Sequence, residues 1–328
     1  MSLETDHIVD RRRMRRKVTF WRVVAFLIAI IAVVGIAAAV RGPGGTFVQP
    51  IAAQISRVTI QGIIRGDEDR TKALDNLADS RATRAVIIHI DSPGGTTAGS
   101  EELHDALRRV ALKKPTVVVV DGMAASGGYI AAMAADHIIA RNTSLVGSIG
   151  VLFQFPNVTH LLDTIGVKVE EIKSSPLKAA PNGLEPTSPE AHAAIQALVV
   201  DSYAWFKGMV QDRRMLDGEA LDHVADGRVF TGRQAIGLKL ADEIGSEREA
   251  IDWLAKTSQI DPKTPVRDWR LTTRFNELSF LHLGTAALLE SIGLGAVAHR
   301  LESLGLLQAV EKLNLDGMLA LWHPSPEN

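Results

Sequence analysis

The sequence predicts an α/β domain built on a mainly parallel sheet, placed after an N-terminal transmembrane helix and followed by a helical tail. Three observations predict this organisation: an uncharged apolar run near the N-terminus, an alternation of strand-like and helix-like segments after it, and amphipathic helical spacing beyond about Pro262. The 328 residues are 46% hydrophobic and 23% charged, which is typical of a folded protein and excludes a disordered or fibrous chain.

The apolar run Val23–Val40 contains eighteen consecutive residues without a charge. As a helix it is about 27 Å long, close to the thickness of the hydrocarbon core of a bilayer. Residues 1–22 hold seven Lys and Arg against three Asp and Glu, a net charge of +4, so the N-terminus is expected in the cytoplasm. A cleaved signal peptide is the alternative, because Ala37–Ala39 is typical of a cleavage site. Both interpretations place the rest of the chain on the far side of the membrane.

The exported part divides into a linker, a domain and a tail. Residues 41–50 contain three Gly and two Pro, which is typical of a linker. Residues 51–262 are the predicted domain. In residues 263–328, apolar side chains such as Leu301 and Leu304 recur among charges at helical spacing. This tail is expected to pack on the domain or on a partner subunit, or to lie on a membrane surface.

Strand-like and helix-like segments alternate through residues 51–262. Strands are predicted at Val58–Ile63, Ala85–Ile90, Thr116–Val120, Ile138–Ala140 and Val167–Ile172. Helices are predicted at Lys72–Ala82, Glu101–Leu112, Ser126–Ala135 and Pro189–Leu216, with a smaller helical cluster at Leu221–Ile244. This rhythm predicts right-handed βαβ crossovers and therefore a mainly parallel sheet.

Charge and cysteine content exclude several classes of function. The net charge of −2 gives no global basic field, so no nucleic-acid partner is expected. Cysteine is absent, which excludes disulfides, thiolate metal sites and a cysteine nucleophile.

Two glycine-containing turns follow the two most apolar predicted strands, at Asp91–Gly95 and Gly122–Gly128. In a parallel sheet both turns lie at the carboxyl ends of strands, the edge where open α/β folds bind ligands. Glycine lets backbone N–H groups face a ligand, so the pair could form an oxyanion hole. Ser126 at the start of the following helix would suit a nucleophile. Taken alone, the first turn is better explained as a common reverse turn, and the second as a common helix start.

A serine nucleophile needs a base. None of the ten histidines is placed persuasively for a Ser–His–Asp arrangement, and the residues around Ser126 differ from the G-x-S-x-G pattern of α/β-hydrolases. A neutral lysine is the other solution, and it requires a dry, apolar pocket. Among the lysines after the second turn, Lys178 has neighbours, Pro176–Pro181, that include no other charge. An exposed loop lysine explains the same pattern.

Four segments in this order carry a family resemblance: IDSPGG, DGMAASGGYIAAMAAD, VGSIGV and IKSSPLKAAP. With the anchor before them, they resemble the signal peptide peptidase A family of bacterial serine peptidases in its single-anchor form, over roughly Val58 to Ile244. The resemblance implies a crotonase- and Clp-protease-like fold and a Ser/Lys dyad. It implies that Ser126 is the nucleophile and Lys178 the general base. It also implies that the hydroxyl of Ser148 orients the lysine and that the amides of Gly95 and Gly127 form the oxyanion hole.

The same resemblance implies a serine endopeptidase of the bacterial inner membrane that hydrolyses remnants of cleaved signal peptides on the periplasmic side. It implies a homo-oligomer, and leaves open that serine and lysine come from neighbouring protomers. No metal or cofactor is expected. Two alternatives stay open from the sequence: a crotonase-fold enzyme acting on acyl thioesters, which would share the two turns, and a non-catalytic membrane scaffold, which would need neither Ser126 nor Lys178.

Overall fold

A computed structural model describes residues 21–22, 24, 27, 53–271 and 319–321 of the chain. The anchor predicted at residues 23–40 therefore lies outside the described residues except for Val24 and Leu27, which are helical. The linker at 41–50 and most of the predicted tail also lie outside them. Within the described ranges, no helix combines the length and apolar character needed to cross a bilayer. Every element below belongs to the compact unit Ala52–Asn328.

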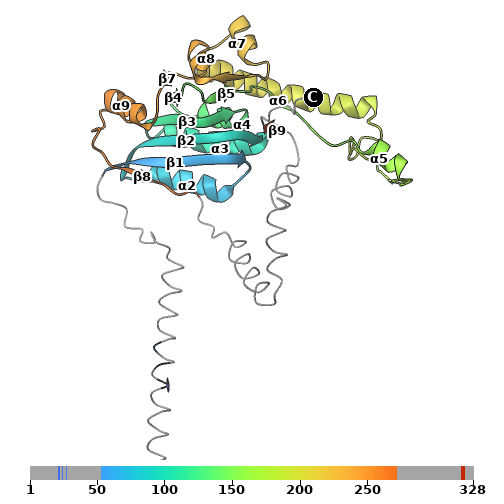
Figure 1. Cartoon of the computed structure of the whole chain (residues 1–328), viewed down its shortest axis with the longest axis horizontal. Helices are drawn as coiled ribbons and strands as arrows, with labels where there is room; N and C mark the ends of the chain where they lie inside the picture. The colour runs from blue at the N-terminus through green and yellow to red at the C-terminus, as the bar shows by residue number, and fades with distance from the viewer. Residues whose placement is uncertain (1–20, 23, 25–26, 28–52, 272–318, 322–328) are drawn as a thin grey trace, which may run out of the picture. The chain divides into compact units, whose positions relative to one another are not determined.

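A mostly parallel sheet of nine strands forms the centre of the described unit (Figure 1). Its main path runs β6-β5-β3-β2-β1-β8; β4 also pairs with β3, β7 pairs with β4, and β9 pairs with β2. Among the strands of the described residues, only the β5–β6 and β2–β9 pairs are antiparallel, so the predicted mainly parallel α/β fold is confirmed. The strands are β1 (Gln54–Ile64), β2 (Thr83–Thr96), β3 (Thr116–Ala125), β4 (His137–Ala140), β5 (Leu145–Gly147), β6 (Val229–Thr231), β7 (Glu243–Ile244), β8 (Val266–Asp268) and β9 (Leu319–Leu321).

The helices pack on both faces of this sheet. The continuous apolar runs of β2 and β3 are explained by burial on both faces, as expected for parallel strands. In β2, Val86 and Ile88 join the larger core cluster with α2, α3 and α4, whereas Ile87 packs with Leu254 of α9. The helices are α2 (Glu68–Asp79), α3 (Thr97–Ala111), α4 (Gly127–Ala132), α5 (Thr159–Thr164), α6 (Pro189–Arg214), α7 (Gly218–Val224), α8 (Gly232–Gly237) and α9 (Glu247–Ser258).

Side-chain caps set the starts of two helices. The hydroxyl of Thr96 accepts a hydrogen bond of 3.2 Å from the amide of Gly99, so α3 begins earlier than the predicted Glu101. At α6, the hydroxyl of Ser188 accepts a hydrogen bond of 3.1 Å from the amide of Ala191 and Pro189 opens the helix, as the sequence predicted.

The predicted turn at Asp91–Gly95 is wrong: β2 continues through it as extended strand to Thr96. β1 runs alongside this segment, with Ile64 opposite Gly95. A Cβ atom on Gly95 would lie 1.7 Å from the carbonyl oxygen of Ile64. Glycine is thus needed here because two strand backbones approach closely. The sequence alone does not distinguish such a strand glycine from a turn glycine.

Two further predictions differ from the structure. The strand predicted at Val167–Ile172 is absent; these residues are exposed and have no strand beside them, so their alternating pattern lacks the partner that a strand needs. The region Leu221–Ile244, predicted as a helical cluster, includes most of α7 and all of α8, but also the short strands β6 and β7. In addition, β8 pairs with β1 beyond the predicted domain end at residue 262.

An ion-pair cluster joins α9 to the sheet. The guanidinium group of Arg57 donates hydrogen bonds of 2.6 and 2.5 Å to the carboxylate of Glu247 and one of 2.8 Å to Asp268. His89 lies 2.8 Å from the same Glu247 carboxylate. The hydrogen bond from Arg57 lowers the pKa of Glu247, with a smaller contribution from His89.

We expect Glu247→Gln to lower the Tm by a few degrees at pH 7 and by much less at pH 3. Because the folded-state pKa is lowered, the stabilisation is present above the ordinary value of about 4.3 and is lost as pH falls through the folded value. Thermal unfolding at both pH values measures the difference. Glu219→Gln, at an exposed position of α7, is the control. An equal loss of Tm at both pH values would contradict this account.

Candidate active site

Ser126 lies at the sharp turn where β3 ends and α4 begins. Its backbone φ of 53° and ψ of −118° fall outside the regions that non-glycine residues usually adopt. The amide of Ser126 donates a hydrogen bond of 2.7 Å to the carbonyl of Gly147, and its carbonyl accepts from the amides of Tyr129 and Ile130. The residue is only 1% exposed. These bonds hold one serine in a strained conformation, a feature that clusters at functional sites.

Ser148 directly follows β5, the strand paired with the end of β3. β3 and β5 pair in parallel with Ala125 opposite Gly147, so Ser126 and Ser148 each follow a paired residue. Ser148 is also buried and has a positive φ of 52°, and its amide donates a hydrogen bond of 2.8 Å to the carbonyl of Arg228. The structure thus brings together two of the predicted site residues, both with constrained backbones.

The two predicted oxyanion donors lie on the elements next to Ser126. Gly127 follows it directly as the first residue of α4. α4 packs against β2 so closely that a Cβ atom on Gly128 would lie 2.6 Å from the carbonyl oxygen of Ser92. Gly95 follows three residues after Ser92 on β2. Ser126, Gly127, Ser148 and Gly95 therefore gather at the carboxyl edge of the parallel strands, where the sequence predicted them.

Lys178 does not join this group within one chain. It lies in an exposed turn between α5 and α6, where its amide donates a hydrogen bond of 3.1 Å to the carbonyl of Ser175. Figure 1 shows α6 leading away from the sheet, with α5 beside the far end of α6. We call residues 159–200 the arm. Within the described ranges, no hydrogen bond joins Lys178 to Ser126, and one chain does not enclose this lysine.

The neighbouring Lys173 is a poor candidate for the base. Its ammonium group lies 2.6 Å from the carboxylate of Glu171 and also contacts Glu185. Hydrogen bonds to these two carboxylates raise the pKa of Lys173, Glu171 having the larger effect. A lysine held in its charged form cannot accept a proton from a serine, so the arm offers Lys178 rather than Lys173.

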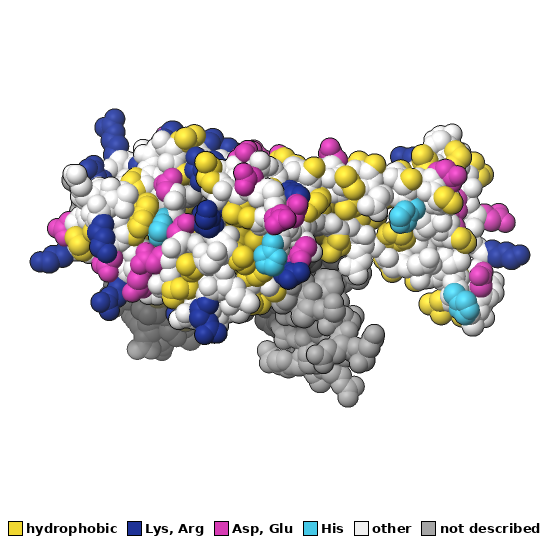
Figure 2. All heavy atoms as spheres, turned by 90° about the horizontal axis from the view of Figure 1, so that it is seen from above, with side chains coloured by type: hydrophobic (Ala, Val, Ile, Leu, Met, Phe, Trp, Pro, Cys, Tyr) yellow, Lys and Arg dark blue, Asp and Glu magenta, His cyan; other side chains and the backbone are white. Residues whose placement is uncertain are grey.

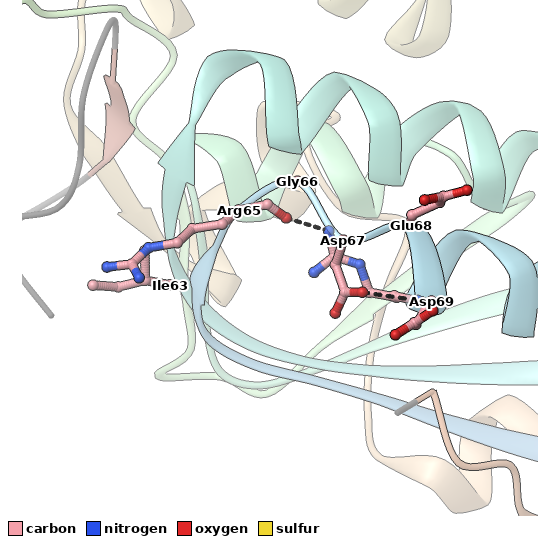
Figure 3. A pocket seen from close by; sticks show the side chains of 7 residues that line it. Ile63, Arg65, Gly66, Asp67, Glu68 and Asp69 are labelled. Carbon is pink, nitrogen blue, oxygen red and sulfur yellow. Dashed lines mark hydrogen bonds between the residues drawn. The ribbon is translucent and has the colours of Figure 1, made fainter. Parts of the chain in front are cut away.

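A polar cavity of about 480 Å³ opens near the end of β1, lined by Ile63 and Arg65–Arg70 (Figure 3). Two of its charged side chains bond to the local backbone: the carboxylate of Asp67 accepts a hydrogen bond from the amide of Arg70, and the guanidinium of Arg70 donates one to the carbonyl of Arg65. The cavity contains none of the five predicted site residues, so it is separate from the predicted site.

Sequence reasoning missed one element at the site. β9 pairs with β2 at Gly94–Thr96, next to the predicted oxyanion donor Gly95. The residues of β9 fall in the region predicted to be a helical tail. A three-residue apolar strand carries no periodicity of its own, so only tertiary pairing reveals it.

The fold and the site define the class of protein. Residues 66–145 match a family model described as Clp protease, which agrees with the mostly parallel α/β fold. Residues 108–261 match the model of peptidase family S49. The chain belongs to this family, that of signal peptide peptidase A, and is a serine peptidase.

Individual relatives agree with this membership. A Synechocystis sp. protein named as a protease is 36% identical over 211 residues, which cover 64% of this chain and 76% of that protein. Protease 4 of Haemophilus influenzae is 30% identical, covering 79% of this chain and 43% of its own length. The chloroplastic serine protease SPPA of Arabidopsis thaliana is 32% identical, covering 68% and 31%. The chain thus spans less than half of the last two relatives.

Among solved structures, a mutant ClpP1 from Listeria monocytogenes is 18% identical with a TM-score of 0.41, covering 59% of this chain and 92% of that one. That likeness is too distant to place any residue of the site.

The strain at Ser126 predicts a stability difference between two variants at this position. Glycine adopts a positive φ without steric cost, whereas the Cβ atom of alanine makes the same conformation unfavourable. We expect Ser126→Gly to be more stable than Ser126→Ala by about 1 kcal/mol, or about 2–4 °C in Tm for a domain of this size. Differential scanning calorimetry of the two variants tests this. A Ser126→Ala variant as stable as Ser126→Gly would show that the backbone at this position is not strained.

Proposed function

We propose that the peptidase works by a Ser/Lys dyad in which Ser126 is the nucleophile and Lys178 of a neighbouring copy is the general base. The observation that carries this proposal is the contrast between the two residues. Ser126 is buried and rigidly held, while Lys178 is exposed in the arm of the same chain. A lysine base must be neutral and therefore needs a dry environment. A second copy packed over the arm would provide one.

The surface of the arm supports assembly into a homo-oligomer. Figure 2 shows hydrophobic side chains along the arm and its outer end. Large exposed apolar patches in soluble domains are typical of protein–protein interfaces. The exposed apolar residues of the arm are Leu161, Ile165, Val167, Val169, Ile172, Leu177, Leu184, Leu198 and Val200.

In the proposed mechanism, neutral Lys178 takes the hydroxyl proton of Ser126 as the serine oxygen attacks the peptide carbonyl. The amides of Gly95 and Gly127 stabilise the oxyanion, and the hydroxyl of Ser148 orients the lysine. The C–N bond then breaks, and the lysine returns its proton to the leaving amine. Water hydrolyses the acyl-enzyme by the same route, with the lysine taking a proton from the water and returning it to Ser126.

We further propose that the substrates are remnants of cleaved signal peptides, bound as extended strands. The name of a relative from Enterococcus faecium, a signal peptide peptidase, supports this substrate class. The predicted anchor at residues 23–40 supports a site held at the membrane, with the N-terminus in the cytoplasm and the peptidase domain on the periplasmic side of a bacterial inner membrane.

Family membership favours this function over an acyl-thioester enzyme and over a non-catalytic scaffold. Purified full-length protein in detergent should hydrolyse a synthetic signal peptide at internal bonds, as mapped by mass spectrometry, and should leave an acyl-CoA thioester intact. Faster hydrolysis of the thioester than of any peptide would overturn the proposed substrate class.

A further inference from the structure

Ser92 is not among the five predicted site residues, yet it lies against both elements that carry the proposed oxyanion donors. We propose that Ser92 is a positioning residue, whose hydroxyl group fixes the end of β2 so that the amide of Gly95 is held in place for the oxyanion. This inference rests on the proposed function, in which Gly95 and Gly127 form the oxyanion hole, and adds to it the side chain that sets their geometry.

A β-bulge interrupts the pairing of β1 and β2 just before Gly95. In this bulge Gly62 of β1 faces two residues of β2, Ser92 and Pro93. Gly62 and Gly94 have positive φ angles of 70° and 103°, a region that favours glycine. A bulge bends its strand and changes the direction of the groups that follow it. The direction of the Gly95 amide therefore depends on how this bulge is held.

The hydroxyl group of Ser92 holds the bulge from within. It donates a hydrogen bond of 2.7 Å to the carbonyl of Gly62 and accepts one of 3.1 Å from the amide of Gly94. Pro93 has no N–H group with which to bond across the bulge. The side chain of Ser92 thus replaces a backbone ladder bond and ties β1 to the residue directly before Gly95. Ser92 is completely buried, so both bonds lie in the interior.

The second proposed donor lies on the other side of Ser92. A Cβ atom on Gly128 would lie 2.6 Å from the carbonyl oxygen of Ser92 and 3.3 Å from its Cβ atom. Gly128 follows Gly127 at the start of α4. Ser92 is thus bonded through its side chain to the segment before Gly95 and packed through its main chain against the helix start that carries Gly127. One residue links the supports of the two amides.

An oxyanion hole is effective because its donors are in place before charge develops on the substrate oxygen. Ser92→Ala would leave the carbonyl of Gly62 and the amide of Gly94 without this partner in the interior, and the bulge is expected to shift in response. A shift of the Gly95 amide weakens its bond to the oxyanion in the transition state. Binding of the uncharged peptide in the ground state depends on it much less.

We expect Ser92→Ala in the full-length protein to lower kcat for a fluorogenic peptide at least about tenfold, with KM within about twofold of wild type. Ser56→Ala is the matched control. Ser56 is also completely buried and its hydroxyl lies 2.8 Å from that of Thr83, but it is near the start of β1, far along the strand from Ile64 opposite Gly95.

Both variants lose a buried hydrogen bond, so both should show a similar fall in Tm, measured by circular dichroism. Only Ser92→Ala should lose kcat. Equal kcat in Ser92→Ala and Ser56→Ala, whether retained or lost, would overturn the proposal.

A transition-state analogue tests the oxyanion hole without turnover. The probes are a peptide aldehyde and the matching peptide alcohol, both ending at the mapped cleavage site. The oxygen of Ser126 bonds to the aldehyde carbon, the hydroxyl proton passes to the base, and the π electrons of the carbonyl move to its oxygen, which becomes the oxyanion. The alcohol forms no such adduct. Ser92→Ala should raise the Ki of the aldehyde at least about tenfold and leave the Ki of the alcohol unchanged.

The two probes separate this inference from the proposed function. If wild-type protein binds the aldehyde no more tightly than the alcohol, the proposed chemistry of Ser126 fails and the role of Ser92 fails with it. If wild-type protein prefers the aldehyde and Ser92→Ala keeps that preference in full, the chemistry stands and the positioning role of Ser92 is refuted.

Discussion

Replacing Ser126 by alanine should reduce kcat for peptide hydrolysis by at least about 10³-fold, because the variant has no oxygen that can form the acyl-enzyme. The side chain makes no hydrogen bond to another side chain among the described residues, so the fold should survive. Turnover of a fluorogenic peptide, with circular dichroism to verify folding, measures the effect.

Ser80→Ala is the matched control for this experiment. Ser80 is also buried, but it lies at the end of α2, where its hydroxyl accepts a hydrogen bond from Thr83. The control should keep wild-type kcat even if its Tm falls. A Ser126→Ala variant that retains more than about a tenth of wild-type kcat would exclude Ser126 as the nucleophile.

Replacing Lys178 by alanine should reduce kcat by a similar factor, since the serine would lose its base. Lys178→Arg should be as inactive as Lys178→Ala, because a guanidinium stays protonated and cannot accept the proton. A lysine that contributed only positive charge would be rescued by arginine, so the pair of variants separates the two roles.

Lys168→Ala is the control within the same arm. Lys168 is likewise exposed, ten residues before Lys178. Its replacement should leave kcat unchanged, as measured in the same peptide assay. Loss of activity in Lys168→Ala equal to that in Lys178→Ala would point to a general charge effect of the arm and contradict the dyad.

The sequence predicts the centre of the fold well because its signals are local and strong. The strand at Thr116–Val120 is predicted by its β-branched run, and the helix after Glu101 by its apolar periodicity. Both patterns reflect burial, which any parallel sheet covered by helices provides. The long helix beginning at Pro189 follows from its cap and its periodicity. These elements needed no information about distant partners.

Elements that depend on a partner are the ones that sequence patterns miss. The sequence of Asp91–Gly95 predicts a turn because glycine is common both in turns and where two strands approach closely. The segment is a strand because it lies against Ile64 of the neighbouring strand. Val167–Ile172 alternates like a strand but has none beside it in the described unit. β9 has three residues and exists only through its pairing with β2 and Leu152.

The same distinction applies to the site. Ser126, Gly127 and Ser148 occupy short segments that follow adjacent strands, so their motifs predict positions that the sheet brings together. Lys178 stands out by a charge-free neighbourhood, a pattern that fits an exposed loop as well as a dry pocket, so the sequence left its exposure in one chain open. A pocket formed between copies has no signature in the spacing of residues along the chain.

The most direct test of a shared dyad is complementation between two inactive variants. Ser126→Ala protein retains Lys178, and Lys178→Ala protein retains Ser126. When the two are mixed at equal amounts and allowed to reassemble, about a quarter of the sites should pair an intact serine with an intact lysine, and activity should recover to about that fraction of wild type. Continued inactivity of the reassembled mixture, with each variant folded and assembled, would contradict a dyad completed between neighbouring copies.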